Sequence, residues 1–270
     1  MKSSQVFIAS FWKDVEWLRH NLITLKKFSE GFLPPVVCVT VQDYPIFKDV
    51  VAQSYPGAIL ATHNGVGFMG AQVAMMMCDI YCPDADYIFL LGSDCMAVDK
   101  FTPAPFFDES GLPVMLYNTF DHLLKFHPGV MPWKTGTERV LGFECPVETM
   151  RRIPIVYPRE LYAHVRSHIE RLHGQTFSEY IHEADRPRGD TSESNILGGY
   201  AHRFMPHLFR WWNMDENYNE SVARWPSSIL QFWSKAANGM DSPCDRDFKY
   251  SGGTTLGKTP RQVFKEVMGE

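Results

Sequence analysis

The sequence predicts an α/β protein built on a mostly parallel sheet that is flanked by helices. Over residues 1–120, short apolar runs typical of buried strands alternate with segments of helical periodicity. The run at 87–91, YIFLL, is unbroken and ends at Gly92, as expected for a strand that is buried on both faces. Alternation of strands and helices at this spacing indicates right-handed βαβ units.

The N-terminal half contains four expected strands and the helices that connect them. We expect strands at 5–10, 36–41, 58–62 and 87–91, and helices at 15–28, 46–53 and 68–81. The first helix is the clearest, because its apolar residues recur at helical spacing. Gly31 and the pair Pro34-Pro35 are expected to end it.

The pattern is looser in the second half, which we expect to be mainly helical. A strand is predicted at 114–118, a long functional loop at 120–142, and helices at 147–153, 159–173 and 192–203. The last 45 residues are expected to be irregular until a short helix after Pro260. We treat 1–120 and 121–270 as two halves of one continuous domain.

Composition restricts the class of protein. A chain of 270 residues with 45% hydrophobic residues can bury a substantial core, and its net charge of −5 argues against a protein that coats nucleic acid. No apolar run reaches 18 residues, so no membrane span is expected. The six cysteines lack zinc-site spacing and the N-terminus does not resemble a signal peptide, so we expect reduced thiols and a cytoplasmic protein.

Residues 252–259, GGTTLGKT, match the P-loop pattern. A P-loop should follow a buried strand, whereas the preceding DRDFKYS is polar, and we expect no later strand to supply the second acid. A P-loop phosphotransferase is therefore the weakest hypothesis. The same loop would serve as a C-terminal flap whose amides and Lys258 meet a diphosphate.

Three segments resemble the nucleotide-sugar-dependent glycosyltransferases of the GT-A fold. They are VFIASFWKDVEWL, GFMGAQVAMMMCDIYCPDADYIFLLGSDCMAV and TSESNILGGYAHRF, and their order and spacing carry the resemblance. It implies a Rossmann-like sheet for the donor, with a looser helical subdomain on the acceptor side. It also implies transfer of a sugar from a nucleoside-diphosphate sugar, expected to be a UDP-sugar, to an acceptor that is a saccharide, a protein or a modified nucleobase.

In that family the central strand ends in Asp-x-Asp, which holds Mn²⁺ or Mg²⁺ on the diphosphate and so offsets charge on the leaving group. Here Gly92-Ser93-Asp94 lacks the first acid, and Asp94 matches the second. Asp99 lies too far along the chain to replace the missing carboxylate. The resemblance therefore implies that Asp94 binds metal and diphosphate beside Gly92 and Ser93, and leaves strict metal dependence open.

The resemblance also implies binding residues at the other strand exits. The nucleotide-sugar side would use Ser10, Trp12, Asp14, Asp43 and Gln72 in addition to Lys258. Asp43 would contact the uracil or ribose. Each of these residues could instead be an ordinary polar residue of a loop or turn.

On the acceptor side, Glu193 is the candidate base, because an inverting transferase must take a proton from the acceptor hydroxyl. Asp190, Ser192 and Glu193 also resemble a helix cap with its partner acid, and a retaining enzyme would not need this base. His202 is a candidate third metal ligand, although a lone histidine is more often structural. The missing first acid motivates an alternative, a catalytically silent relative that binds a glycan or nucleotide sugar.

Overall fold

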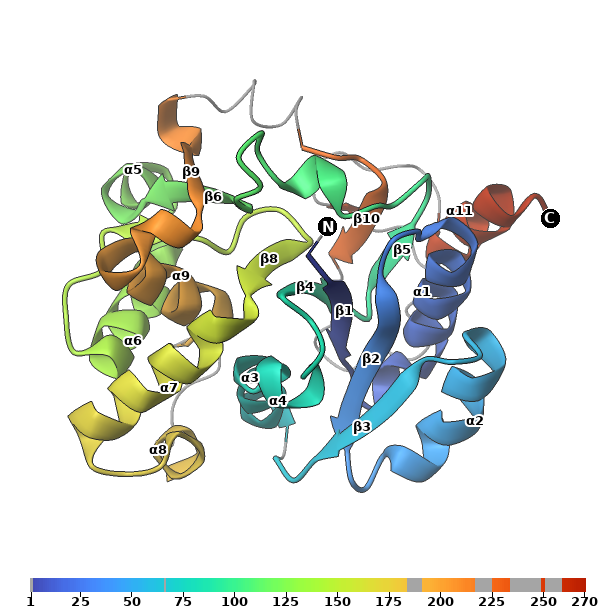
Figure 1. Ribbon diagram of the computed structural model, residues 1–270, viewed down its shortest axis with the longest axis horizontal. Coiled ribbons are helices and arrows are strands. Elements are labelled where there is room, and N and C mark those ends of the chain that lie inside the picture. The colour runs from blue at the N-terminus through green and yellow to red at the C-terminus, as the bar shows by residue number, and fades with distance from the viewer. Residues whose placement is uncertain (1, 66, 184–190, 217–224, 234–248, 251–258) are drawn as a thin grey trace.

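The computed structural model describes residues 2–65, 67–183, 191–216, 225–233, 249–250 and 259–270. The chain forms an α/β fold around a five-stranded sheet with the strand order β3-β2-β1-β4-β8 (Figure 1). The first four of these strands are parallel, and β8 runs antiparallel to β4. Their bounds are β1 (Ser4–Ala9), β2 (Leu33–Thr40), β3 (Ile59–His63), β4 (Tyr87–Gly92) and β8 (Ile155–Pro158).

Helices cover both faces of this sheet (Figure 1). One face carries α1 (Val15–Phe28) and α2 (Tyr44–Ser54), and the other carries α3 (Gly67–Met76), α4 (Cys78–Tyr81) and α7 (Arg159–His173). Alternate residues of a strand point to opposite faces, so Val6 and Ile8 of β1 join the core under α1 while Phe7 joins the core under α3. This double covering explains the unbroken apolar runs.

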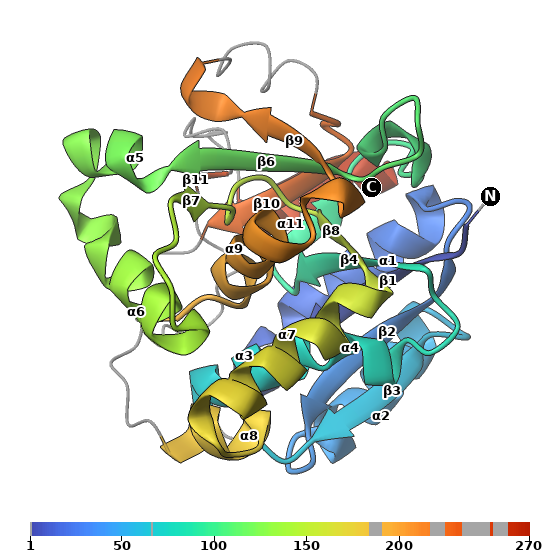
Figure 2. The same cartoon turned by 60° about the vertical axis from the view of Figure 1, so that its left-hand side comes forward.

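Two smaller sheets extend this framework. One has the order β7-β6-β9, in which β6 and β9 lie side by side (Figure 2), and the other has the order β11-β10-β5. Their strands are β5 (Cys95–Ala97), β6 (Val114–Thr119), β7 (Val147–Glu148), β9 (Arg210–Asn213), β10 (Ile229–Trp233) and β11 (Lys249–Tyr250). The remaining helices are α5 (Phe120–Phe126), α6 (Met131–Leu141), α8 (Phe177–Glu183), α9 (Glu193–Phe204) and α11 (Pro260–Met268), with 3₁₀ turns η1 (Trp12–Asp14), η2 (Ala104–Phe106), η3 (Pro128–Val130) and η4 (Pro206–Leu208).

The strand order creates a topological switch point between β1 and β4. The chain moves outward from β1 to β2 and β3, then returns to pair β4 with the other side of β1. Ala9 lies opposite Gly92, so these two strands end at the same place. Open α/β sheets bind ligands at such a point, outside the carboxyl ends of the strands.

The α/β class and the mostly parallel sheet are confirmed, and the helices predicted at 15–28 and 159–173 have those bounds. Five cysteines of the described part, Cys38, Cys78, Cys82, Cys95 and Cys145, are free and buried. Among the described helices, none has the length and apolar character needed to cross a bilayer.

The loop predicted at 120–142 is wrong, because this segment forms α5 and α6. Thr119 caps α5 by accepting a hydrogen bond from the N–H of His122 at 3.2 Å. Gly142 ends α6 in the left-handed region, with φ of 71°. Prolines and histidines suggested an aperiodic segment, whereas Pro128 and Pro132 lie at helix starts, where a missing N–H costs little.

The helix predicted at 147–153 is also wrong, since Val147 and Glu148 pair with β6 and the following turn leads into β8. The single helix predicted at 68–81 is divided at Met77, whose N–H bonds to the carbonyl of Ala74 in a tighter turn. Pro34 and Pro35 lie within β2, just after its first residue Leu33, and do not end the first helix, which stops at Phe28. The C-terminal region was expected to be irregular before its last helix, but it contains β10, which pairs with β5.

Candidate functional site

Two carboxylates meet at the switch point between β1 and β4. Asp14 ends the turn η1 that follows β1, while Ser93 and Asp94 follow β4 directly. The hydroxyl of Ser93 donates to Oδ2 of Asp14 at 2.6 Å. The charge of Asp14 also acts on Asp94, so the structure brings together three residues that the sequence predicted separately.

The surroundings of these carboxylates oppose ionisation. Burial raises the pKa of Asp14 to about 6, although the hydrogen bond from Ser93 acts to lower it. Burial and then the charge of Asp14 raise the pKa of Asp94 to about 7, although side chains of Gln231 and Cys95 act in the opposite direction. Asp14 and Asp94 are each half-buried as whole residues, so part of each remains exposed to solvent. A positive charge placed here would favour the ionised form of both carboxylates and lower their pKa values.

The turn that follows β4 explains why residue 92 is glycine. A Cβ at Gly92 would lie 2.2 Å from Oδ1 of Asp94, because the Asp94 carboxylate folds back over that α-carbon. Asn21 of α1 holds this turn by donating from Nδ2 to the carbonyl of Gly92 at 3.0 Å. An acid at position 92 would therefore displace Asp94, and Asp14 supplies the neighbouring carboxylate instead.

Asp43 and Trp12 link the exits of β2 and β1. The backbone N–H of Trp12 donates to Oδ2 of Asp43 at 3.1 Å, and the Asp43 residue is buried. Trp12 itself is 56% exposed. Ser10, which follows β1 directly, is buried, and its hydroxyl has no hydrogen-bond partner within the part of the chain that the structure describes. Asp43 therefore shapes this edge, and its contact with a nucleoside stays a prediction.

Gln72 and Glu193 form the second polar centre. Gln72 lies on α3 and Glu193 is the first residue of α9. Oε1 of Gln72 accepts from the backbone N–H of Glu193 at 2.7 Å, and the Gln72 amide donates to the Glu193 carboxylate. Burial raises the pKa of Glu193 even though Ser194 and Gln72 donate to it. A carboxylate of raised pKa is a stronger base than an ordinary one, and Glu193 remains half-buried.

The cap predicted for Ser192 and Glu193 is not formed as expected. Ser192 is the N-cap residue, but its side chain makes no cap hydrogen bond and its hydroxyl instead contacts the sulfur of Met150 at 3.6 Å. Glu193 stands at the first helical position, whereas the partner acid of a capping box stands at the third. Asp190 lies outside the described residues.

The remaining predicted residues lie away from these two centres or outside the described residues. His202, near the end of α9, packs edge-on against Trp211 with ring centroids 5.0 Å apart, and burial lowers its pKa. Its role as a metal ligand stays a prediction. Lys258 and the loop 252–258 lie outside the described residues. The preceding strand β11 pairs antiparallel with β10, which is unlike the parallel strand that a P-loop follows.

The donor chemistry at the switch point fits a hard divalent cation. In the described ranges, no group of three or more His, Cys, Asp or Glu side chains is arranged for metal binding. Mg²⁺ sites that also hold a substrate diphosphate commonly use only one or two protein carboxylates, with water and phosphate oxygens completing the shell. The pair Asp14 and Asp94 meets that requirement, and Gly92 leaves the space in which the second carboxylate folds.

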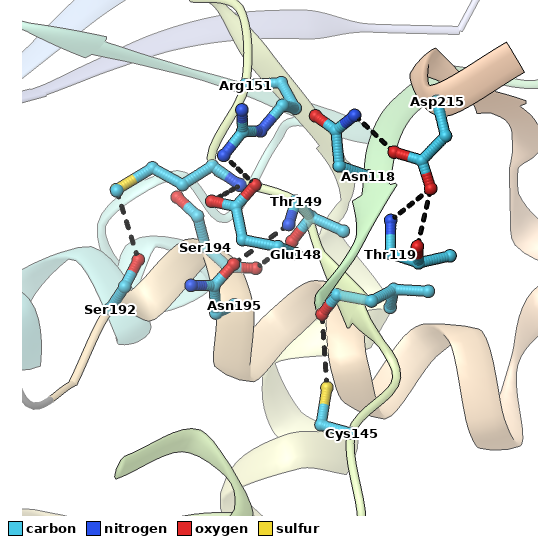
Figure 3. A network of polar contacts seen from close by, with 12 residues as sticks. Asn118, Thr119, Cys145, Glu148, Thr149, Arg151, Ser192, Ser194, Asn195 and Asp215 are labelled. Carbon is cyan, nitrogen blue, oxygen red and sulfur yellow. Dashed lines mark hydrogen bonds and ion pairs between the residues drawn. The ribbon is translucent and has the colours of Figure 1, made fainter. Parts of the chain in front are cut away.

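Sequence reasoning missed a polar network beside α9 (Figure 3). Glu148 is fully buried and forms an ion pair with Arg151, and burial raises its pKa to about 7. Next to it, Oδ1 of Asn195 accepts from the N–H of Thr149 at 2.9 Å, and Nδ2 of Asn195 has no partner among the described residues. The misassigned helix at 147–153 hid this network, because only the strand pairing of β7 turns Glu148 inward.

A second part of the network lies at the end of β6. Asp215 accepts from Nδ2 of Asn118 at 2.6 Å and from the N–H and hydroxyl of Thr119 at 3.0 and 2.6 Å (Figure 3). Burial would raise the pKa of Asp215, but these hydrogen bonds outweigh it and lower the pKa overall. Asp215 is therefore favoured as an ionised carboxylate. Its hydrogen bonds fix the segment after β9 to the end of β6.

A groove of about 460 Å³ lies over β6 and β9. Aromatic side chains of Phe107, Trp212 and Trp225 line it together with the charged residues Asp108, Glu109 and Arg210. Trp225 also packs edge-on against Phe106, so this tryptophan contributes to the core as well as to the groove.

Comparison with known proteins finds no matching protein-family profile and no curated protein with a significant match. The function of the site is therefore inferred from its geometry.

Proposed function

We propose that this chain is a glycosyltransferase that moves a sugar from a nucleoside-diphosphate sugar, expected to be a UDP-sugar, to an acceptor hydroxyl. The convergence of Asp14, Ser93 and Asp94 at the switch point supports the proposal most strongly. This is the position at which open α/β sheets bind nucleotides, and the acidic side chains there call for a cation between protein and diphosphate.

The donor side differs from a dinucleotide-binding fold in a way that favours this proposal. A glycine-rich loop after the first strand would bring backbone amides to the phosphates, whereas here β1 is followed by Ser10 and the sequence FWKD. Asp14 and Asp94 would hold Mn²⁺ or Mg²⁺, which when bound offsets the charge that develops on the leaving diphosphate. Asp43 and Trp12 would border the nucleoside.

On the acceptor side, Glu193 would take the proton from the acceptor hydroxyl. The acceptor oxygen then forms its bond to the anomeric carbon of the sugar while the bond from that carbon to the diphosphate breaks. The diphosphate leaves with the electron pair. This arrangement describes an inverting enzyme, and a retaining enzyme would need Glu193 only for binding.

A thermal-shift panel tests the proposal directly. Nucleotide sugars, free nucleoside diphosphates and ATP are each added with and without Mn²⁺, since a ligand that binds only the native state raises its apparent stability. We expect stabilisation by a nucleotide sugar that is larger with Mn²⁺. Stabilisation by none of the sugars, or by ATP alone, would contradict the proposal.

The alternative is a silent protein that binds the same donor without transferring it. Gly92 in place of an acid supports this alternative, because the switch point then offers two carboxylates from different strands instead of a contiguous pair. Slow hydrolysis of the bound nucleotide sugar distinguishes the two. An enzyme should release free sugar and nucleoside diphosphate, and a binding protein should return the donor intact.

A further inference from the structure

We propose that Gln72 is a positioning residue that holds the Glu193 carboxylate for its reaction and couples the donor-side helix α3 to the acceptor-side helix α9. The inference rests on the proposed function in one respect, the action of Glu193 on the acceptor. The contact itself belongs to the structure whatever the reaction is, and it can be tested without any substrate.

The start of α9 depends on Gln72. The first four N–H groups of a helix have no partner within the helix, and the N-cap residue Ser192 does not supply one from its side chain. Oε1 of Gln72 accepts from the N–H of Glu193 at 2.7 Å across a separation of 121 residues. Gln72 is only 7% exposed, so water does not compete freely for this contact.

An amide is the side chain that suits both halves of this contact. Glutamine presents an acceptor and a donor on one planar group. The acceptor meets the backbone N–H of Glu193 and the donor meets its carboxylate. A glutamate at position 72 would satisfy the helix start equally well, because negative charge is favourable at a helix N-terminus, but it would repel the Glu193 carboxylate. The helix start alone does not explain why residue 72 is Gln and not Glu. The neighbouring Glu193 carboxylate does explain it.

Among the residues that the structure describes, the contacts that shift the pKa of Glu193 come from hydrogen bonds and not from a neighbouring charge. Ser194, the next residue of α9, donates its hydroxyl to Oε1 of Glu193 at 2.9 Å. Tyr157 of β8 lies near enough to interact electrostatically, and burial raises its pKa well above the usual value, so it stays neutral. The charge of Glu148, which is paired with Arg151, also acts on Tyr157. Gln72 is thus the only one of these contacts that comes from the donor-side helices.

The decisive variant is Gln72→Glu, which keeps the acceptor for the N–H, removes the donor and adds a negative charge. Carboxyl ¹³C NMR measures the titration of Glu193, whose signal is assigned by its absence in Glu193→Gln. We expect the pKa of Glu193 to rise by about one pH unit or more in Gln72→Glu, because a like charge opposes ionisation. The matched control is Gln53→Glu on the exposed side of α2, which should leave the Glu193 titration unchanged.

A second variant, Gln72→Leu, removes both hydrogen bonds. We expect fast amide exchange at the Glu193 N–H and about a 100-fold loss of kcat, with the affinity for the donor unchanged. A Gln72→Glu protein that is folded but titrates Glu193 as the wild type does would overturn the inference. So would loss of donor affinity in Gln72→Leu without a change at Glu193, since that result would make Gln72 a donor contact.

Two further outcomes keep the test decisive. If both variants fail to fold, amide exchange of the wild-type protein decides, because rapid exchange of the Glu193 N–H would show that Gln72 does not hold it. If no nucleotide sugar binds any form of the protein, the proposed function fails. The shift of the Glu193 titration would still establish or refute the coupling between the two helices.

Discussion

The hydroxyl of Ser93 donates to Oδ2 of Asp14 at 2.6 Å, and this contact holds the exit of β4 against the exit of β1. Asp94 follows immediately, so the two carboxylates lie on either side of one hydrogen-bonded bridge between neighbouring strands. A contiguous acidic pair would place both charges on one turn. Here each strand contributes one, and the pairing exists only once the parallel sheet has formed.

Asp94→Asn should abolish most of the stabilisation that Mn²⁺ gives to the protein with a nucleoside diphosphate bound. Loss of one charged contact is worth roughly 1.5–3 kcal/mol, which corresponds to about 10- to 100-fold weaker cation binding. Isothermal titration with Mn²⁺ and UDP measures this, and circular dichroism checks the fold. Asp99→Asn, at an exposed position nearby, is the control. Full retention of Mn²⁺ binding in Asp94→Asn would show that the site is misassigned.

Metal-free stability should fall as pH rises. The folded pKa values of Asp14 and Asp94 are about 6 and about 7, above the ordinary value of 3.8. Between pH 3.8 and about 7 the folded state therefore binds more protons than the unfolded state, and its stability decreases through that window. In EDTA, the Tm of Asp94→Asn should decline less with pH than that of the wild type. Parallel curves for the two proteins would contradict the raised pKa of Asp94.

Cation binding should show the opposite trend with pH. A divalent cation needs both carboxylates ionised, so protons compete with it wherever Asp14 or Asp94 is protonated. The Mn²⁺-dependent increase in Tm should be larger at pH 8 than at pH 6. An equal increase at both values would indicate that Mn²⁺ binds away from this pair.

Gly92→Ala should preserve the fold and disturb the Asp94 carboxylate. The added Cβ would lie 2.2 Å from Oδ1 of Asp94, and that side chain end can rotate away while the backbone stays in place. We expect a Tm within a few degrees of the wild type and a clear loss of Mn²⁺ affinity. Gly129→Ala, where a Cβ meets nothing within 4 Å, should change neither. Unchanged Mn²⁺ affinity in Gly92→Ala would mean that this carboxylate orientation is not needed.

The N-terminal half could be predicted from the sequence because its signals are local. Apolar runs such as 87–91 and the helical spacing of α1 follow from burial on one sheet, and the placement of Asp14, Asp43 and Asp94 at strand exits follows from the parallel arrangement. The bridge from Ser93 to Asp14 could not be predicted, since it depends on which strands become neighbours.

The second half was harder to predict because its short strands owe their existence to partners far along the chain. β7 is two residues long and exists through pairing with β6, and β10 exists through pairing with β5. Local propensity therefore gave a helix at 147–153 and missed the buried Glu148. The contact between Gln72 and Glu193 was likewise invisible, although both residues were singled out separately.

Glu193→Gln separates a catalytic role from a structural one. Gln at this position can still accept from the Ser194 hydroxyl and keep the N–H bonded to Gln72, so α9 should remain intact and the Tm should change little. It cannot take a proton from the acceptor, and loss of a general base lowers kcat by about 10²- to 10⁴-fold. Donor affinity should stay the same, which distinguishes this variant from Asp94→Asn. Glu160→Gln, also in the first turn of a helix but exposed, is the matched control. Normal turnover in Glu193→Gln would leave this residue only its role at the start of α9 and would favour a retaining enzyme or a silent binding protein.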